Sequence, residues 1–155
     1  MLDSPVTMPS GRAERAPLRL LGAALLLVDA YIHVQQSVGA TDHPPLATAF
    51  AASALGMLAG AALLLTRAPR LGWLIGGSTA ALTLLGFVLT RSVGVPLLDP
   101  TDDLGNWTET AGVIAAGLEV LLSAFTIIAV GDRHKVHGRI IRAEIQATTP
   151  GLRET

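Results

Sequence analysis

The chain has 155 residues, of which 50% are hydrophobic and 15% are charged, and its net charge is −1. A soluble domain carries about 25% charged residues, so this composition favours a membrane protein over a soluble helical bundle, and the balanced charge indicates no nucleic-acid partner. The chain contains no cysteine, which excludes disulfides, thiolate metal sites, iron–sulfur clusters and cysteine nucleophiles.

Charged residues are nearly absent from four blocks of the chain, and the second and third blocks have none. A helix needs roughly 20 apolar residues to cross a hydrocarbon core about 30 Å thick. The blocks predict membrane spans at about 18–37, 46–66, 71–90 and 109–130. Short connections make neighbouring helices run antiparallel, so the expected fold is all-α, a four-helix transmembrane bundle of up-down-up-down topology.

The polar segments outside the spans predict the orientation. Residues 1–17 are rich in helix breakers and are expected to form a disordered N-terminal tail, and 131–155 form a basic tail. Basic residues precede the first span, separate the second from the third and follow the fourth, and Arg91 alone falls on the other side. Because basic residues are retained in the cytoplasm, both termini are predicted to be cytoplasmic, in a multi-pass protein of the bacterial plasma membrane.

A cleaved signal peptide is the competing interpretation of the first span, since residues 15–28, "RAPLRLLGAALLLV", have a basic front and an apolar middle. Cleavage would leave three spans and place the basic tail outside, against the charge distribution. The tail itself has apolar residues on one face of a helix, so it is expected either to lie on an anionic leaflet or to remain solvated.

Small residues recur at helical spacing in the second and third spans, and such stripes allow close helix contact in lipid. We expect them to pack these two helices together or within the bundle, with a homodimer face as the alternative. Trp73 and Trp107 are expected to be anchors at the membrane interface. The two stripes are Ala52, Gly56 and Gly60, and Gly72, Gly76 and Ala80.

Polar residues interrupt the first and fourth spans. Asp29, His33 and Gln36 share one helix face. Asp29 and Glu119 each lie about ten residues, or ~15 Å, from opposite surfaces and therefore near the midplane. A carboxylate facing lipid there is costly, so both are expected to face the bundle interior and to be protonated, shared with His33 or in contact with water.

Three further polar or charged positions are predicted near the outer boundary, where they would extend the midplane groups into one polar column. They are Gln36, Arg91 and Glu109. Arg91 would also reach the midplane carboxylates if its side chain pointed inward.

The stretches "TRSVGVP" and "WTETAGVIAAGLE" resemble small four-span membrane proteins of actinobacterial type that have no assigned function. The family often has a proline where this chain has Thr110, a departure that affects the helix start. The resemblance covers the four spans and implies the fold and the choice of polar residues, and it supplies no chemistry. The matching residues are His33, Arg91, Gly94, Pro96, Trp107, Glu109, Gly112 and Glu119.

Four functions are compatible with this pattern, and the first is a structural or accessory membrane subunit in which Asp29, His33, Gln36 and Glu119 clamp the helices. Its partners would be the lipid bilayer and a second copy or a larger membrane complex, with no cofactor. The second function is proton or cation translocation by Asp29, His33 and Glu119, although no inverted repeat or broken helix is visible.

The third function is a bound metal, haem or quinone near the outer face. It would use His33 with Glu119, Asp29 or His43, although this spacing is not diagnostic of a metal site. The fourth is catalysis, which is not predicted because the sequence has no Ser/His/Asp signature, phosphate loop or zincin motif.

Overall fold

The computed structural model describes residues 16–96 and 103–148, and the regular elements in this part of the chain are all helices. They are α1 (Ala16–Gly39), α2 (Pro44–Leu65), α3 (Pro69–Ser92) and α4 (Thr110–Thr148). Four stretches are long and apolar enough to cross a membrane, namely α1, α2, α3 and residues Thr110–Gly131 of α4. The predicted all-α class is confirmed, and each of the four predicted spans is a helix of suitable length and apolarity.

The ends of the helices follow from proline and glycine. Pro44 and Pro69 stand in the first turns of α2 and α3, where a proline sacrifices no intrahelical hydrogen bond. At the end of α3, Gly94 has a φ of 71°, and its amide donates to the carbonyl of Leu89 at 3.1 Å. Glycine adopts this left-handed conformation without strain and so ends the helix.

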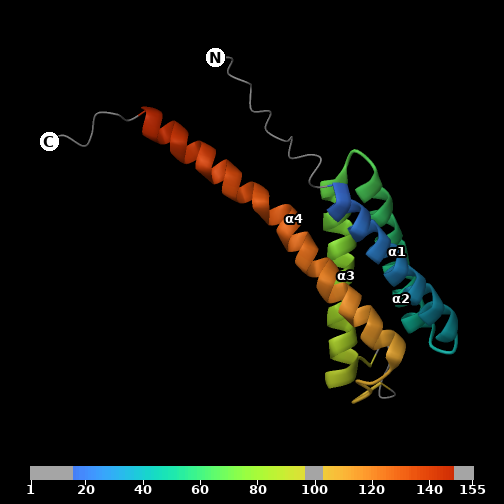
Figure 1. Cartoon of the computed structure of the whole chain (residues 1–155). Helices are drawn as coiled ribbons and strands as arrows, with labels where there is room; N and C mark the ends of the chain where they lie inside the picture. The colour runs from blue at the N-terminus through green and yellow to red at the C-terminus, as the bar shows by residue number, and fades with distance from the viewer. Residues whose placement is uncertain (1–15, 97–102, 149–155) are drawn as a thin grey trace.

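The fourth helix is longer than the predicted span. It continues from Gly131 to Thr148, and Figure 1 shows α4 extending well past the ends of the other three helices. No proline occurs between Thr110 and Pro150, so every residue in between retains the amide that a helix requires. The predicted basic tail therefore begins as a continuation of α4, and residues 1–15 and 149–155 lie outside the described part of the chain.

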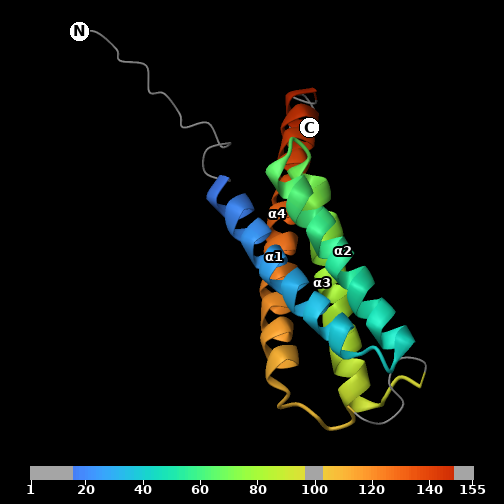
Figure 2. The same cartoon turned by 90° about the vertical axis from the view of Figure 1, so that its right-hand side faces the viewer.

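The most extensive contacts join α1 to α2, α2 to α3 and α3 to α4, and α1 also packs against α4 (Figures 1 and 2). Leu26, Met57, Leu64 and Leu122 are completely buried at the centre. Because α1 contributes to this core, it is an integral helix of the bundle. Cleavage after the first span would remove part of the core.

Close backbone contact joins α2 to α3 through the predicted glycine stripes. A Cβ atom added at Gly60 would lie 2.6 Å from the Cα of Gly76, and one added at Gly72 would lie 2.6 Å from the amide nitrogen of Leu64. No side chain fits at these positions. The prediction that the stripes pack these two helices together is confirmed, and these glycines are covered within one chain.

The two tryptophans have different environments. Trp107 is 46% exposed, as an interfacial anchor requires, but Trp73 is only 4% exposed, so its predicted role as an anchor is wrong. Its indole lies against Gly22 and meets the ring of Phe125 edge-on at 6.4 Å. Because Gly22 has no side chain, the indole of Trp73 fits against the backbone of α1 inside the bundle.

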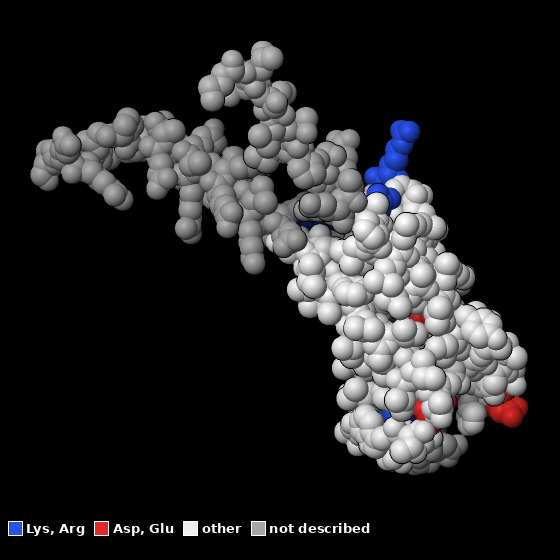
Figure 3. Space-filling model, viewed as in Figure 1, with Lys and Arg blue, Asp and Glu red and all other residues white. Residues whose placement is uncertain are grey.

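The outer surface of the bundle is apolar. Large side chains such as Leu55, Leu82 and Ile127 are 68%, 68% and 73% exposed. In the view of Figure 3 most charged residues of the described chain gather towards the two ends, and the band between them is white apart from a small red patch. A soluble protein does not expose apolar surface on this scale, whereas lipid covers it, and the soluble alternative is disfavoured.

Candidate functional site

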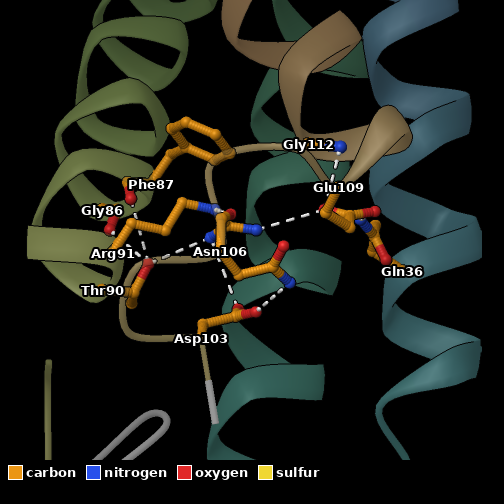
Figure 4. A network of polar contacts seen from close by, with 9 residues as sticks. All are labelled: Gln36, Gly86, Phe87, Thr90, Arg91, Asp103, Asn106, Glu109 and Gly112. Carbon is orange, nitrogen blue, oxygen red and sulfur yellow. Dashed lines mark hydrogen bonds and ion pairs between the residues drawn. The ribbon is translucent and has the colours of Figure 1, made fainter. Parts of the chain in front are cut away.

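The six predicted polar residues form two clusters. Asp29, His33 and Glu119 are all buried between α1 and α4, with exposures of 0%, 4% and 2%, and we call them the core triad. Gln36, Arg91 and Glu109 lie near the connection from α3 to α4 together with Asp103 and Asn106 (Figure 4), and we call these five residues the loop cluster. The predicted single column is therefore divided into two groups with different bonding.

His33 is the centre of the core triad. Its Nδ1 atom lies 3.5 Å from Oδ1 of Asp29, and its Nε2 atom lies 3.5 Å from Oε1 of Glu119. The ring therefore separates the two carboxyl groups, one on each side. Phe50 of α2 covers the ring edge-on at a centroid distance of 5.9 Å, so the triad is shielded by an apolar neighbour.

The backbone fixes the orientation of the imidazole. Nδ1 of His33 lies 3.0 Å from the carbonyl oxygen of Asp29, one turn earlier in α1. A carbonyl only accepts hydrogen bonds, so this bond assigns the proton of a neutral ring to Nδ1. The lone pair of Nε2 then points towards Glu119.

Three of the four carboxylate oxygens of the core triad lack hydrogen-bond partners within the described chain. Both carboxyl oxygens of Asp29 and Oε2 of Glu119 are buried and accept no hydrogen bond, and the hydroxyl of Ser123 is also unpartnered. Buried polar groups normally have partners, and an exception indicates a bound species or a functional role. The predicted clamp requires the residues of the core triad to hydrogen-bond to one another, and three of their carboxylate oxygens have no such bond.

In the loop cluster, in contrast, the charged side chains have hydrogen-bond or ion-pair partners. Arg91 is 7% exposed, and its guanidinium donates from Nε to the carbonyl of Asn106 at 2.9 Å and from Nη2 to Oε2 of Glu109 at 3.1 Å. Nη1 lies 3.2 Å from the hydroxyl of Thr90 and 3.4 Å from Oδ2 of Asp103. Arg91 thus binds the α3–α4 connection, and its side chain engages the loop cluster instead of the midplane carboxylates.

Glu109 connects this arginine to two other elements. Its Oε1 accepts from the amide of Gln36 on α1 at 3.3 Å, and its Oε2 accepts from the backbone amide of Gly112 at 3.0 Å. A Cβ atom at Gly112 would collide with Oε2 of Glu109 and approach Phe87. The glycine therefore lets α4 begin directly beside the carboxylate, and the loop cluster fastens α1, α3 and α4 together.

A cavity of about 380 Å³ connects the two clusters. His33 and Glu119 line one part of it, and Gln36, Arg91 and Glu109 line another. The side chains of Asp103 and Glu109 are 29% and 32% exposed, so the part lined by the loop cluster borders the surface. Asp29 does not line the cavity and lies beyond His33.

Sequence reasoning missed several contributors. Asp103 and Asn106 lie between the third and fourth predicted spans, and no pattern indicated that they fold onto Arg91. His43, the predicted additional metal ligand, is exposed at the start of α2. The cluster of potential metal ligands that the structure describes consists of Asp29, His33 and Glu119, with ligating atoms within 4.8 Å of one another.

Comparison of the chain with protein-family models, with curated proteins and with solved structures found no match.

Proposed function

We propose that this protein is a multi-pass protein of the bacterial plasma membrane that binds one divalent transition-metal ion at the core triad. Both termini are cytoplasmic in this proposal, the helices run up-down-up-down, and the loop cluster faces outward. The distribution of Lys and Arg supports the orientation. The resemblance to the actinobacterial-type family rests on the sequence, and five of its residues, His33, Arg91, Glu109, Gly112 and Glu119, border the same cavity.

The observation that carries the metal proposal is the pair of electron-rich atoms facing each other across the core triad. Nε2 of His33 and Oε1 of Glu119 are 3.5 Å apart. Two ligands at about 2.0–2.2 Å from a tetrahedral zinc ion lie roughly 3.4 Å apart. The separation therefore suits two ligands of one ion, while it is long for a hydrogen bond.

The surrounding groups support the same function. A hydrogen bond from Nδ1 of a ligating histidine to a carbonyl or carboxylate is the usual support of a metal site, and Asp29 offers both groups to His33. Two buried carboxylates bring two negative charges that need compensation. A divalent ion supplies it, and the cavity leaves room for further ligands beside Glu119.

Metal binding is tested with Co²⁺, whose visible absorption reports its coordination. Purified, chelator-treated protein is expected to bind one equivalent, and Glu119→Gln and His33→Gln are expected to abolish the absorption. Asp29→Asn is expected to weaken binding roughly 10–100-fold, because it removes only the support of His33. Glu109→Gln is the matched control, since it changes a carboxylate of the same cavity outside the triad.

The proposal is wrong if wild-type protein takes up no metal, or if Glu119→Gln binds Co²⁺ as well as wild type does. In the first case the buried carboxylates are kept neutral by protons, and the triad is a proton-sharing site of the kind that cation translocation uses.

A structural or accessory subunit is the second candidate function, and the loop cluster favours it. Arg91, Glu109 and Gln36 fasten three helices with satisfied hydrogen bonds, as a clamp should. An accessory subunit is expected to co-purify in mild detergent with a larger membrane complex and to bind no metal. Purification from its native membrane, with metal content measured in the same sample, separates the two candidates.

The orientation has its own test, which the absence of native cysteine makes simple. Asp42→Cys is expected to react with a membrane-impermeant maleimide added to intact cells. Arg67→Cys is expected to react only after the cells are opened. The reverse pattern would overturn the proposed orientation.

A further inference from the structure

The cavity between the two clusters has the size of a small-molecule site. Its volume of about 380 Å³ falls within the range of roughly 300–1,000 Å³ that is typical of small-molecule sites. Residues from all four helices line it, including Phe50 of α2, Phe87 of α3 and Ala115 of α4. The site is therefore built only when the helices assemble.

The packing around the cavity shows that the open space is local. At Gly60 and Gly72 an added Cβ atom would strike backbone, whereas at Gly86, which lines the cavity, it would meet nothing within 4 Å. Atoms that border a void lose dispersion contacts. The helices α2 and α3 are therefore in close contact at Gly60 and Gly72, but an open space that could hold a side chain remains beside Gly86.

The two clusters determine which ligand chemistry the cavity accepts. Every nitrogen of the Arg91 guanidinium is engaged by Asn106, Thr90, Asp103 or Glu109, so the arginine offers no free fork to an anion. Glu109 is engaged by Arg91, Gln36 and the amide of Gly112. Arg91 faces two carboxylates, Glu109 and Asp103, so the cluster keeps an excess of negative charge that disfavours an anionic ligand.

The core triad offers hydrogen bonds that the protein leaves unused. Oε2 of Glu119, which is 2% exposed as a residue, has no partner in the described chain, and Glu119 lines the cavity together with Thr83. The hydroxyl of Thr83 donates to backbone carbonyls of its own helix and keeps its lone pairs as acceptors. Acceptors are thus available in this part of the cavity for a ligand that donates a hydrogen bond.

The walls between the clusters are apolar and partly aromatic. Ile32, Leu46, Phe50, Leu82 and Phe87 contribute to them. An aromatic ring packs well against such walls in edge-to-face or offset geometry. From the apolar walls, the fully engaged Arg91 and the free acceptors, we propose that the cavity binds an uncharged lipid-soluble aromatic alcohol, of the phenol or quinol class, with its hydroxyl directed at Glu119.

The test uses three naphthalene probes that differ in one substituent. Chelator-treated protein in nanodiscs is dialysed to equilibrium against 2-naphthol, 2-methylnaphthalene or 2-naphthalenesulfonate, with empty nanodiscs as the baseline for partition into lipid. We expect one saturable site for 2-naphthol, with at least tenfold weaker binding of 2-methylnaphthalene and no saturable binding of the sulfonate. Because no metal is present, this result is independent of the outcome with Co²⁺.

Two glycine variants locate the site. Gly86→Leu fills the cavity and is expected to abolish saturable 2-naphthol binding. Gly117→Leu is the matched control, because an added Cβ atom there also meets nothing within 4 Å but the residue is exposed on the outer face of α4, and its binding is expected to equal that of wild type. If Gly86→Leu fails to fold, Ala49→Leu enters the same cavity from α2.

The proposal is overturned by any of three results. Equal binding of 2-methylnaphthalene would show that the cavity takes an apolar chain, such as a lipid tail, without using Glu119. Preferential binding of the sulfonate would identify an anion site. Undiminished 2-naphthol binding in folded Gly86→Leu and Ala49→Leu proteins would place the site outside this cavity.

Discussion

Replacing Arg91 with glutamine is expected to destabilise the bundle more than any change in the core triad. The guanidinium makes three hydrogen bonds, to Asn106, Thr90 and Glu109. It also lies 3.4 Å from Asp103 and 4.0 Å above the ring of Phe87. Glutamine retains the polarity of the side chain but not its charge or its reach.

The size of this loss follows from burial. Breaking a fully buried ion pair costs about 3–5 kcal/mol, but the partners Glu109 and Asp103 are 32% and 29% exposed, and water partly compensates them. Glu109 also keeps its bonds to Gln36 and Gly112. We therefore expect Arg91→Gln to lower the free energy of unfolding by about 2–3 kcal/mol.

The assay is equilibrium unfolding in mild detergent by titration with a denaturing detergent, followed by far-ultraviolet circular dichroism. Glu109→Gln and the double variant complete a thermodynamic cycle, in which the pair is expected to show a coupling energy of about 1–2 kcal/mol. If Arg91→Gln unfolds within about 0.5 kcal/mol of wild type, the range for an ordinary surface substitution, the loop cluster does not fasten the helices.

The remaining predictions use the same unfolding assay. In metal-free protein, Glu119→Gln is expected to be neutral or stabilising, because Oε2 of this buried carboxylate has no hydrogen-bond partner. A loss above about 2 kcal/mol would restore the clamp interpretation. Gly60→Ala is expected to cost about 1–3 kcal/mol by forcing α2 away from α3, while Gly117→Ala costs nothing, and equal stability of both variants would contradict the backbone contact. Arg19→Gln is expected to cost about 1 kcal/mol, because the arginine donates at 2.6 and 2.9 Å to the carbonyl of Leu64 at the end of α2; unchanged stability would show that water replaces this cap.

The sequence by itself determined the all-α class of this protein and the positions of its four apolar segments, although not the end of α4. Apolar blocks of the length that crosses a bilayer can be counted from the residues, and Pro44, Pro69 and Gly94 act within one turn of where they stand. The cost of exposing Asp29 and Glu119 to lipid was sufficient to predict that both are buried. These inferences depend on local properties and on the solvent, which do not require knowledge of the fold.

The tertiary structure alone decided how the polar residues group and what they leave unsatisfied. The separation of Arg91 from the core triad depends on the path of the loop that carries Asp103 and Asn106, and no periodicity encodes that path. The burial of Trp73 depends on Gly22, which is 51 positions away in the sequence. The cavity is a space between four helices, and its existence at Gly86 is a property of their packing. Whether a polar group has a hydrogen-bond partner likewise depends on differences of a few tenths of an ångström in the distance between two elements. A sequence does not contain these distances.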